Sequence, residues 1–473
     1  MSQTTTVAVE LNDVGVVAAG PGLQSMDRSP GYALLDDNRV LVGREAVDRA
    51  RLKPRWVANR FWDRLDAEPL GRPFPRSLRN ADLVHAHLGA VWQSVQRSLD
   101  TRSVQGIEAV VLAVPGFYSS QQLGLLLGIG RSSGVPIAGM VDSALVSSVG
   151  LTAVERALHL DILLQRVVLT ELAQSRSLAR QRVESDATAG LSRVMDLWAK
   201  LIASRFVQQT RFDPFHHGES EQDLYDQLPG WIAEIARNEG ALLTLEYRGK
   251  IHSIEISAAE MQSAVRVVYQ GISNLVRAVA STGSRPALVL SQDLSKLPGL
   301  QSELEEAVGS EAAILESGAA ATGALEQQHL LVREGEPEVE FVTELPLEPP
   351  TGSPVSASPA TSRLPRDASE AIVKPPTHLL YEGVAHPIDK DPLVLGLATP
   401  AETRGVNLTG STAGVSRRHC SLWRQGDEVI VEDHSTYGSF LNGGRIEGRA
   451  LLAAGDRLRL GTPGIELHLI AVE

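Results

Sequence analysis

The stretch Gly414–Leu422 reads GVSRRHCSL and places a hydroxyl, two guanidinium groups and an imidazole at four consecutive positions, 416–419. Three interpretations fit these residue types. They form a phosphate-binding loop, a metal or catalytic fragment, or a solvated turn that enters a strand, since charged residues usually cover exposed surface. The flanking sequence decides between them.

The sequence on both sides of this stretch predicts a small all-β domain. Short apolar runs alternate with clusters of Gly, Asp and Asn, and no helical periodicity interrupts them. Several short strands at such spacing are typical of a β-sandwich. The runs are LLYEGVAHPI, PLVLG, HCSLWRQ, EVIVED, GSFLNG, RALLAAGDRLRLG and IELHLIAVE.

Residues 377–473 resemble a forkhead-associated (FHA) domain, because LVLG, VSRRHCSL, EDHSTYGSFLNG and LAAGDRLRLG follow one another in the order of that family. The resemblance implies an eleven-stranded sandwich whose loops bind phosphothreonine peptides. A phosphothreonine carries about two negative charges and is bound by hydroxyl, amide and guanidinium donors. The resemblance assigns phosphate contacts to Ser416, Arg417 and Thr436 and a structural role to Gly396, His419, Asn442 and Gly443.

Two positions depart from the FHA pattern. Leu397 stands where the family usually has an arginine that grips the phosphate, and Arg404 in the following loop is the candidate substitute. Tyr437 stands where the family has an asparagine that positions the bound peptide. Loss of a charge-assisted donor costs about 2 kcal/mol. The sequence therefore leaves open whether recognition requires phosphate.

Residues 331–376 are rich in Pro, Ser, Glu and Ala and lack sustained apolar periodicity. Such a composition buries too little apolar surface to offset the entropy of ordering, so a flexible linker is predicted.

Residues 1–330 alternate strand-like and helix-like runs, which favours an α/β fold. TVAVEL and VGVVAA predict a hairpin at Asn12-Asp13, and LHLDILLQRVVLTEL predicts another. A strand, a loop and a helix capped by Ser119 or Ser120 are expected in IEAVVLAVPGFYSSQQLGLLLGIGRSSGV. A Ser-capped helix is expected in ISAAEMQSAVRVVYQGISNLVRAVAS, and a strand, loop and helix in RPALVLSQDLSKLPGLQSELEEAVG.

These segments, together with LESGAAATGAL, resemble in order the two-lobed actin-like ATPase domain of 70-kDa heat-shock chaperones and shorter DnaK-like proteins. The resemblance implies an ATP site between two phosphate hairpins. Glycine lets backbone N–H groups approach a phosphate closely. Here VELNDVG and LDILLQR lack those glycines, and Ser291 is followed by Gln292-Asp293 in place of a Gly-Gly pair.

The carboxylates that remain are Glu10 and Asp161 at the hairpins and Asp142 in the connecting segment; Ser291 and Gly318 complete the residual nucleotide site. We therefore expect no catalysis and no cofactor, and an adaptor whose degenerate ATPase-type domain is a protein-binding scaffold. The alternatives are an ATP–magnesium switch with weak or altered hydrolysis, and a filament-forming relative.

The composition disfavours several other kinds of partner and site. The net charge of −13 disfavours nucleic-acid partners, because phosphate affinity requires clustered Lys and Arg. One cysteine, the absence of a signal-peptide pattern and the absence of a long apolar run predict a cytoplasmic chain without a membrane span. His216-His217 predicts a surface loop, and no metal site is expected.

Overall fold

The computed structural model describes residues 5–21, 23, 28–100, 106–151, 155–281, 283–332, 339–347, 375–381, 384–398, 404–408, 415–426, 428–435, 438–441, 444–446, 448–453, 456–461 and 465–470. The chain forms two compact units, unit 1 over Met1–Ser353 and unit 2 over Pro354–Glu473. In the part of the chain that is described, no helix combines the length and the apolar character that a membrane crossing requires.

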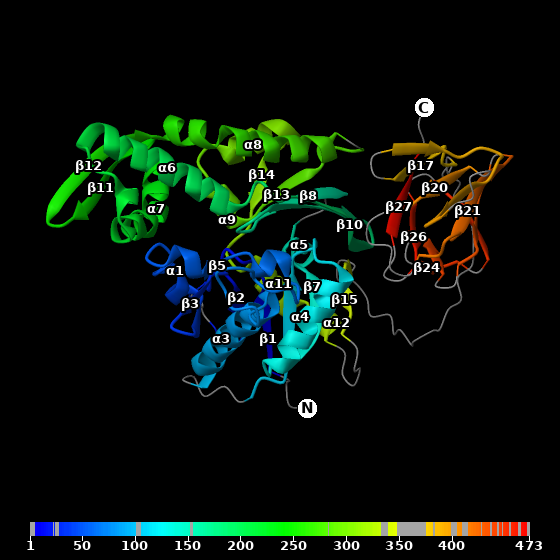
Figure 1. Ribbon diagram of the computed structural model, residues 1–473, viewed down its shortest axis with the longest axis horizontal. Coiled ribbons are helices and arrows are strands. Elements are labelled where there is room, and N and C mark those ends of the chain that lie inside the picture. The colour runs from blue at the N-terminus through cyan, green and yellow to red at the C-terminus, as the bar shows by residue number, and fades with distance from the viewer. Residues whose placement is uncertain are drawn as a thin grey trace, which may run out of the picture. The chain divides into compact units, whose positions relative to one another are not determined.

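Unit 1 contains two mixed sheets built on the same plan (Figure 1). In each sheet, the first strand of a hairpin also pairs in parallel with later strands, which crossover connections join. Sheet A has the order β15 (Phe341–Val342), β7 (Ile137–Asp142), β6 (Ala109–Val114), β1 (Thr6–Glu10) and β2 (Val17–Ala19). Sheet B has the order β14 (Ala312–Ile314), β13 (Ala287–Leu290), β8 (Arg156–Ile162), β9 (Val167–Gln174), β10 (Ser177–Asp186) and β16 (Glu344–Pro346).

The strands pair in the same pattern within each of the two sheets. The β1–β2 hairpin is antiparallel while β1, β6 and β7 run parallel. The β8–β9 hairpin is antiparallel while β8, β13 and β14 run parallel. The arrangement in sheet A is thus repeated in sheet B, and the mixed α/β class predicted for this part of the chain is confirmed.

Helices cover the sheets on their outer faces. One apolar core joins sheet A to α3 (Asn80–Asp100) and α4 (Ser120–Ser132). Another joins sheet B to α6 (Leu191–Thr210), α7 (Gly218–Asn238) and α8 (Ala258–Ala280), and Figure 1 shows α8 lying along β8, β13 and β14. The hairpin of β11 (Gly240–Tyr247) and β12 (Lys250–Ser257) packs on the second core. The predicted caps are confirmed, since Ser119 and Ser257 each form a capping box.

A third core lies between the two sheets. It contains residues of both sheets together with α5 (Ser143–Ser147) and α11 (Ala319–Glu326). These two helices occupy equivalent places, after β7 and after β14, and pack closely. A Cβ on Gly323 of α11 would lie 2.2 Å from the carbonyl oxygen of Val146 in α5, so only glycine allows this approach.

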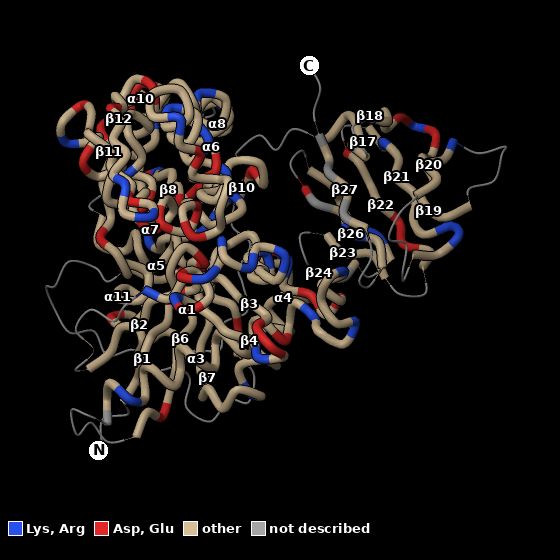
Figure 2. Tube along the Cα trace, turned by 60° about the vertical axis from the view of Figure 1, so that its left-hand side comes forward, with Lys and Arg blue, Asp and Glu red and all other residues tan. Residues whose placement is uncertain are grey.

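The remaining elements of unit 1 are short. A three-stranded sheet consists of β4 (Arg39–Val42), β3 (Ala33–Asp36) and β5 (Val57–Ala58). The short helices are α1 (Arg44–Val47), η1 (Pro54–Trp56), α2 (Phe61–Arg64), η2 (Pro214–His216), α9 (Gln292–Ser295), α10 (Leu300–Val308) and α12 (Gln328–Leu331). Basic and acidic segments are interspersed along unit 1 (Figure 2).

The structure corrects the predicted linker at its start. Phe341–Val342 pairs with β7, and Glu344–Pro346 pairs with β10, so this segment is part of both sheets. Its apolar side chains are too few to show periodicity, but tertiary pairing buries Leu345 to 1% exposure. Residues 348–374 of the predicted linker lie outside the described residues.

Unit 2 is a sandwich of two antiparallel-rich sheets, as predicted. The first has the order β18 (Val384–Pro387), β17 (His378–Tyr381), β27 (Ile465–Ile470), β26 (Arg457–Leu460), β23 (Ser439–Leu441) and β24 (Gly444–Arg445). The second has the order β20 (Gly405–Asn407), β19 (Leu393–Gly396), β21 (Cys420–Gln425), β22 (Glu428–Asp433) and β25 (Arg449–Leu452). One apolar core joins both sheets.

Candidate functional site

In unit 2, the segment after β19 lies directly against the loop that precedes β21. The backbone N–H of Leu397 donates to Ser416 O at 3.2 Å, and that of Ala398 donates to Arg417 O at 3.0 Å. A Cβ on Gly396 would lie 2.1 Å from Arg417 O, so glycine is required by the close approach of the two backbones. The position of Arg417 is therefore fixed through its main chain.

His419 connects this loop to a second one. Its ring is buried, its Nδ1 accepts from the Ser416 N–H at 3.0 Å, and its Nε2 donates to Gly438 O at 3.2 Å. Burial lowers the pKa of His419, against the opposing effects of the Gly438 carbonyl and Asp433. A neutral imidazole with one donor and one acceptor matches both contacts.

The second loop is closed by its own hydroxyl and carboxylate groups. Asp433 accepts from the Ser435 N–H at 3.1 Å and from Ser439 Oγ at 2.8 Å, and Ser435 Oγ accepts from the Gly438 N–H at 2.8 Å. These bonds connect Ser435 both to Asp433 and to Gly438. Ser435 was not among the predicted site residues, although a serine after Asp-His in a polar run is a recognisable turn signal.

The structure brings some of the predicted phosphopeptide residues together and separates one. Ser416 is half-buried and Arg417 is exposed on the same loop. Thr436, Tyr437, Asn442 and Gly443 lie outside the described residues.

Arg404 lies at the opposite end of β19 from this loop. Gly405 is level with Val394, whereas Gly396 is level with Asn407, about 7 Å further along the strand. The Arg404 guanidinium is paired with Asp389 at 2.9 Å and donates to Pro387 O at 2.5 Å. The structure therefore does not place Arg404 beside Ser416 and Arg417. Spacing alone could not reveal this, because the strand register decides it.

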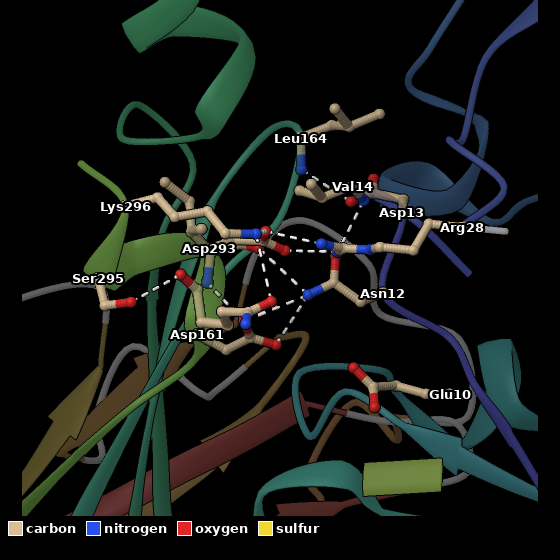
Figure 3. A network of polar contacts seen from close by, with 12 residues as sticks. Glu10, Asn12, Asp13, Val14, Arg28, Asp161, Leu164, Asp293, Ser295 and Lys296 are labelled. Carbon is tan, nitrogen blue, oxygen red and sulfur yellow. Dashed lines mark hydrogen bonds and ion pairs between the residues drawn. The ribbon is translucent and has the colours of Figure 1, made fainter. Parts of the chain in front are cut away.

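In unit 1, a cluster of buried carboxylates lies where the two hairpins face each other (Figure 3). Glu10 Oε2 accepts from the backbone N–H groups of Ala320 at 3.0 Å and Ala321 at 3.3 Å, so it caps the first turn of α11. Burial raises the pKa of Glu10 to about 7, with a further increase from the nearby charge of Asp161. Burial also raises the pKa of Asp161 to about 6.

The two hairpin turns are hydrogen-bonded to each other. Asn12 Nδ2 donates to both oxygens of Asp161 at 3.2 and 3.0 Å. Asp13 Oδ1 accepts from the Leu164 N–H at 2.7 Å, and burial raises the pKa of Asp13 to about 7. Asn12 and Asp13 were predicted only as turn residues. Their bonds join the turns that the chaperone resemblance places on either side of a nucleotide phosphate.

An ion pair completes the cluster. Arg28 Nη1 donates to Asp293 Oδ1 at 2.7 Å, and the second pair of atoms makes the contact bidentate. Lys296 Nζ lies 3.4 Å from the same carboxylate (Figure 3). Although burial opposes it, the Arg28 partner lowers the pKa of Asp293. Neither Arg28 nor Asp293 was predicted as a site residue, because their separation in sequence hides the pair.

The space beside this cluster is small. Glu10, Asp161, Ser291 and Gly318 line a cavity of about 30 Å³. Such a volume holds one or two water molecules, whereas pockets for organic ligands measure roughly 300 Å³ or more. Asp142 has a different position: it accepts from the Ala144 N–H at 2.9 Å at the start of α5 and pairs with Arg180 at 2.8 Å.

No group of His, Cys, Asp or Glu suited to a metal ion occurs among the described residues, and the rings of His216 and His217 contact each other edge-on.

The family that comparison with known proteins identifies lies in unit 2. No curated protein matches the chain. The family model of the FHA domain matches residues 404–461, which include β20 to β26, the Ser416–His419 loop and the turn at Ser435. Residues 404–461 thus belong to an FHA domain, the C-terminal sandwich of this chain.

Proposed function

We propose that the chain is a protein-interaction adaptor whose FHA domain binds a partner phosphorylated on threonine. FHA domains are phosphothreonine-recognising interaction modules. The observation that carries the proposal is the fixed loop at Ser416 and Arg417, held by His419 and by the contact with Gly396, with an exposed guanidinium. A guanidinium on a rigid backbone suits the planar, charge-assisted recognition of a phosphate.

The same surface predicts weaker binding than an FHA site with two arginines. Leu397, 37% exposed, stands at the sequence position where the FHA pattern has the second arginine, and Arg404 is held by Asp389. We therefore assign phosphate recognition to Ser416, Arg417 and Thr436, keep Tyr437 as a candidate peptide contact on the FHA pattern alone, and do not include Arg404.

An array of phosphothreonine peptides and their unphosphorylated counterparts tests the proposal on the full chain. Arg417→Ala removes a charge-assisted bond and is expected to weaken a bound phosphopeptide at least tenfold. Arg449→Ala is the matched control, because this guanidinium lies on β25 and pairs with Glu432. If Ser416→Ala and Arg417→Ala leave every interaction unchanged, the proposal is wrong.

For unit 1 we propose an actin-like, DnaK-like fold that serves as a non-catalytic scaffold. Three features support this: the repeated sheet plan, the contact of α5 with α11 at equivalent places, and the facing hairpin turns. Direct bonds between the turns and the 30 Å³ cavity favour a scaffold over an ATPase.

Titration calorimetry with ATP and magnesium tests this second part. The expected result is no binding at micromolar concentrations. Micromolar binding that is lost in Asp161→Ala would refute it and would favour an ATP-dependent switch. Phosphopeptide binding is measured separately, so each half of the proposal can fail alone.

A further inference from the structure

Unit 1 carries a groove beside the small sheet of β3, β4 and β5 (Figure 1). Its volume is about 730 Å³. Three segments line it: the β3–β4 turn at residues 35–38, residues 52–56 with η1, and the prolines Pro73 and Pro75 of the loop between α2 and α3. All of this lining falls within residues 35–75, so the groove is separate from the residual nucleotide site and from both hairpin turns.

One side of the groove is fixed by the β3–β4 turn. Asp37 and Asn38 have φ values of 45° and 64°, the left-handed conformation that a two-residue hairpin turn requires. Asp36, beside this turn, pairs with Lys53 and accepts from Arg49 Nη1 at 3.4 Å. The turn is thereby joined to the segment that contains η1.

The other side is the tip of the loop between α2 and α3. The Leu70 N–H donates to Leu78 O at 3.0 Å and closes this loop. Residues 72–76, which read RPFPR, form the tip beyond that bond. Phe74 of the tip meets the Trp56 ring edge-on, with the ring centres 6.2 Å apart and the ring planes at 89°. This contact holds the tip against η1.

Large apolar side chains are exposed in the groove. Leu52 is 47% and Trp56 is 38% exposed, and both line it together with Pro54, Pro73 and Pro75. Exposed apolar groups that gather at one place mark interaction sites, whereas single ones are common on any surface. Tryptophan is also enriched among the residues that dominate binding energy at protein interfaces. The groove is therefore suited to an apolar side chain of a protein partner.

Three arginines at this groove have unpaired guanidinium groups. Arg55 lines the groove, and Arg72 and Arg76 flank the two prolines at the tip of the loop. All three side chains are exposed, and none forms a hydrogen bond or an ion pair with the part of the chain that the structure describes. Arginine is enriched at protein interfaces and binds carboxylates through paired N–H groups.

The carboxylates nearby leave these arginines unneutralised. Asp36 and Asp37 are the carboxylates of the lining, and both act on Lys53: the hydrogen bond to Asp36 raises the pKa of Lys53, and the charge of Asp37 adds to this. Along the loop, Asp66 and Glu68 stand at the base, next to the start of α3, and not at the tip. The charge that stays available at the groove is positive, and it is complementary to an acidic segment.

We propose that this groove binds a short acidic segment of a partner protein. An apolar side chain of that segment lies against Trp56 and the prolines, and its carboxylates pair with Arg55, Arg72 and Arg76. Clusters of arginine recognise acidic motifs in this way. The inference rests on the scaffold role proposed for unit 1, and it names the surface and the kind of partner that this role requires.

The test uses fluorescein-labelled peptides and the full chain. The first peptide has eight glutamates around two central leucines, and the second has glutamine in place of every glutamate. In titrations by fluorescence anisotropy we expect saturable binding of the glutamate peptide. The glutamine peptide is expected to bind about tenfold more weakly, as for the loss of three exposed ion pairs.

Three variants locate the site. Arg72→Gln combined with Arg76→Gln is expected to weaken binding of the glutamate peptide roughly fivefold and that of the glutamine peptide less than twofold. Arg193→Gln combined with Arg266→Gln is the matched control, because it also removes two exposed arginines, from α6 and α8, and should leave both affinities unchanged. Trp56→Ala removes the apolar contact and should weaken the glutamate peptide at least tenfold. If Trp56→Ala does not fold, the two arginine variants decide, since all four of their side chains are exposed.

Four results would overturn the inference. They are an unchanged affinity for the glutamate peptide in the loop-tip variant or in folded Trp56→Ala, an equal loss in the control variant, equal affinities of the two peptides for the wild-type chain, and displacement of the glutamate peptide by a tighter-binding oligothymidylate. The last result would identify a nucleic-acid surface. Micromolar ATP binding would refute the scaffold role without changing the peptide affinities, so the two failures are distinguishable.

Discussion

Glu10→Gln changes how the stability of unit 1 depends on pH. In the folded chain the pKa of Glu10 is raised from 4.5 to about 7 by burial and by Asp161. A carboxyl group with a raised pKa in the folded state contributes stability below its unfolded pKa, and this contribution is lost as the pH rises through the folded pKa. The wild-type chain is therefore expected to lose this contribution between pH 4.5 and about 7.

The size of the effect follows from the same values. A difference between 4.5 and about 7 corresponds to at most about 3 kcal/mol, at 1.36 kcal/mol for each unit of pKa. Glutamine does not titrate, and its amide oxygen can still accept from the N–H groups of Ala320 and Ala321. Relative to wild type, Glu10→Gln is thus expected to be about 1–3 kcal/mol more favourable at pH 8 than at pH 5.

Urea unfolding of the full chain at pH 5 and pH 8, followed by tryptophan fluorescence, measures this difference. Glu255→Gln, on the exposed face of β12, is the control and should follow wild type at both pH values. Glu10→Ala removes the cap of α11 and should lose about 1 kcal/mol at pH 5, where Glu10→Gln does not. The reasoning is refuted if Glu10→Gln and wild type differ by the same amount at pH 5 and pH 8.

Three other substitutions test the geometry. In Gly396→Ala the new Cβ would lie 2.1 Å from Arg417 O and should displace Arg417. Phosphopeptide binding, titrated by fluorescence anisotropy, should then weaken at least tenfold, and an unaltered affinity would contradict this expectation. Leu345→Ala should destabilise unit 1 by about 2–4 kcal/mol in urea, because this side chain is 1% exposed; a loss below about 0.5 kcal/mol would show that β16 is dispensable. Arg28→Ala should cost about 3 kcal/mol, because the mostly buried Asp293 loses its bidentate partner and keeps the more distant Lys296. Adding Asp293→Asn should recover part of that loss, whereas strictly additive effects would argue against the pair.

Local patterns predicted the parts of the molecule that local physics determines. Asn12-Asp13 predicted the first hairpin, and the serines at 119 and 257 predicted two helix starts, because turns and caps depend on residues close in sequence. The loop at Ser416 was predicted through four motifs in a fixed order, and the match to the FHA family agrees with it.

Long-range partners could not be predicted in this way. The partner of Arg28 lies 265 residues away, and the position of Arg404 follows from the register of β20 on β19. Leu345 is buried because its strand, β16, pairs with β10 at the edge of sheet B, although the surrounding sequence has the composition of a linker. In each case the deciding energy comes from tertiary contacts that no window of sequence contains.

The segment after α12 limits how far the two sheets of unit 1 can move apart. Only Thr343 separates β15, on the edge of sheet A, from β16, on the edge of sheet B, and Thr343 O accepts from the Arg180 N–H at 2.9 Å. Two residues of extended chain span at most about 7 Å. The sheet edges at β15 and β16 can therefore separate by no more than that distance. A wider opening requires that β15 leave sheet A or that β16 leave sheet B.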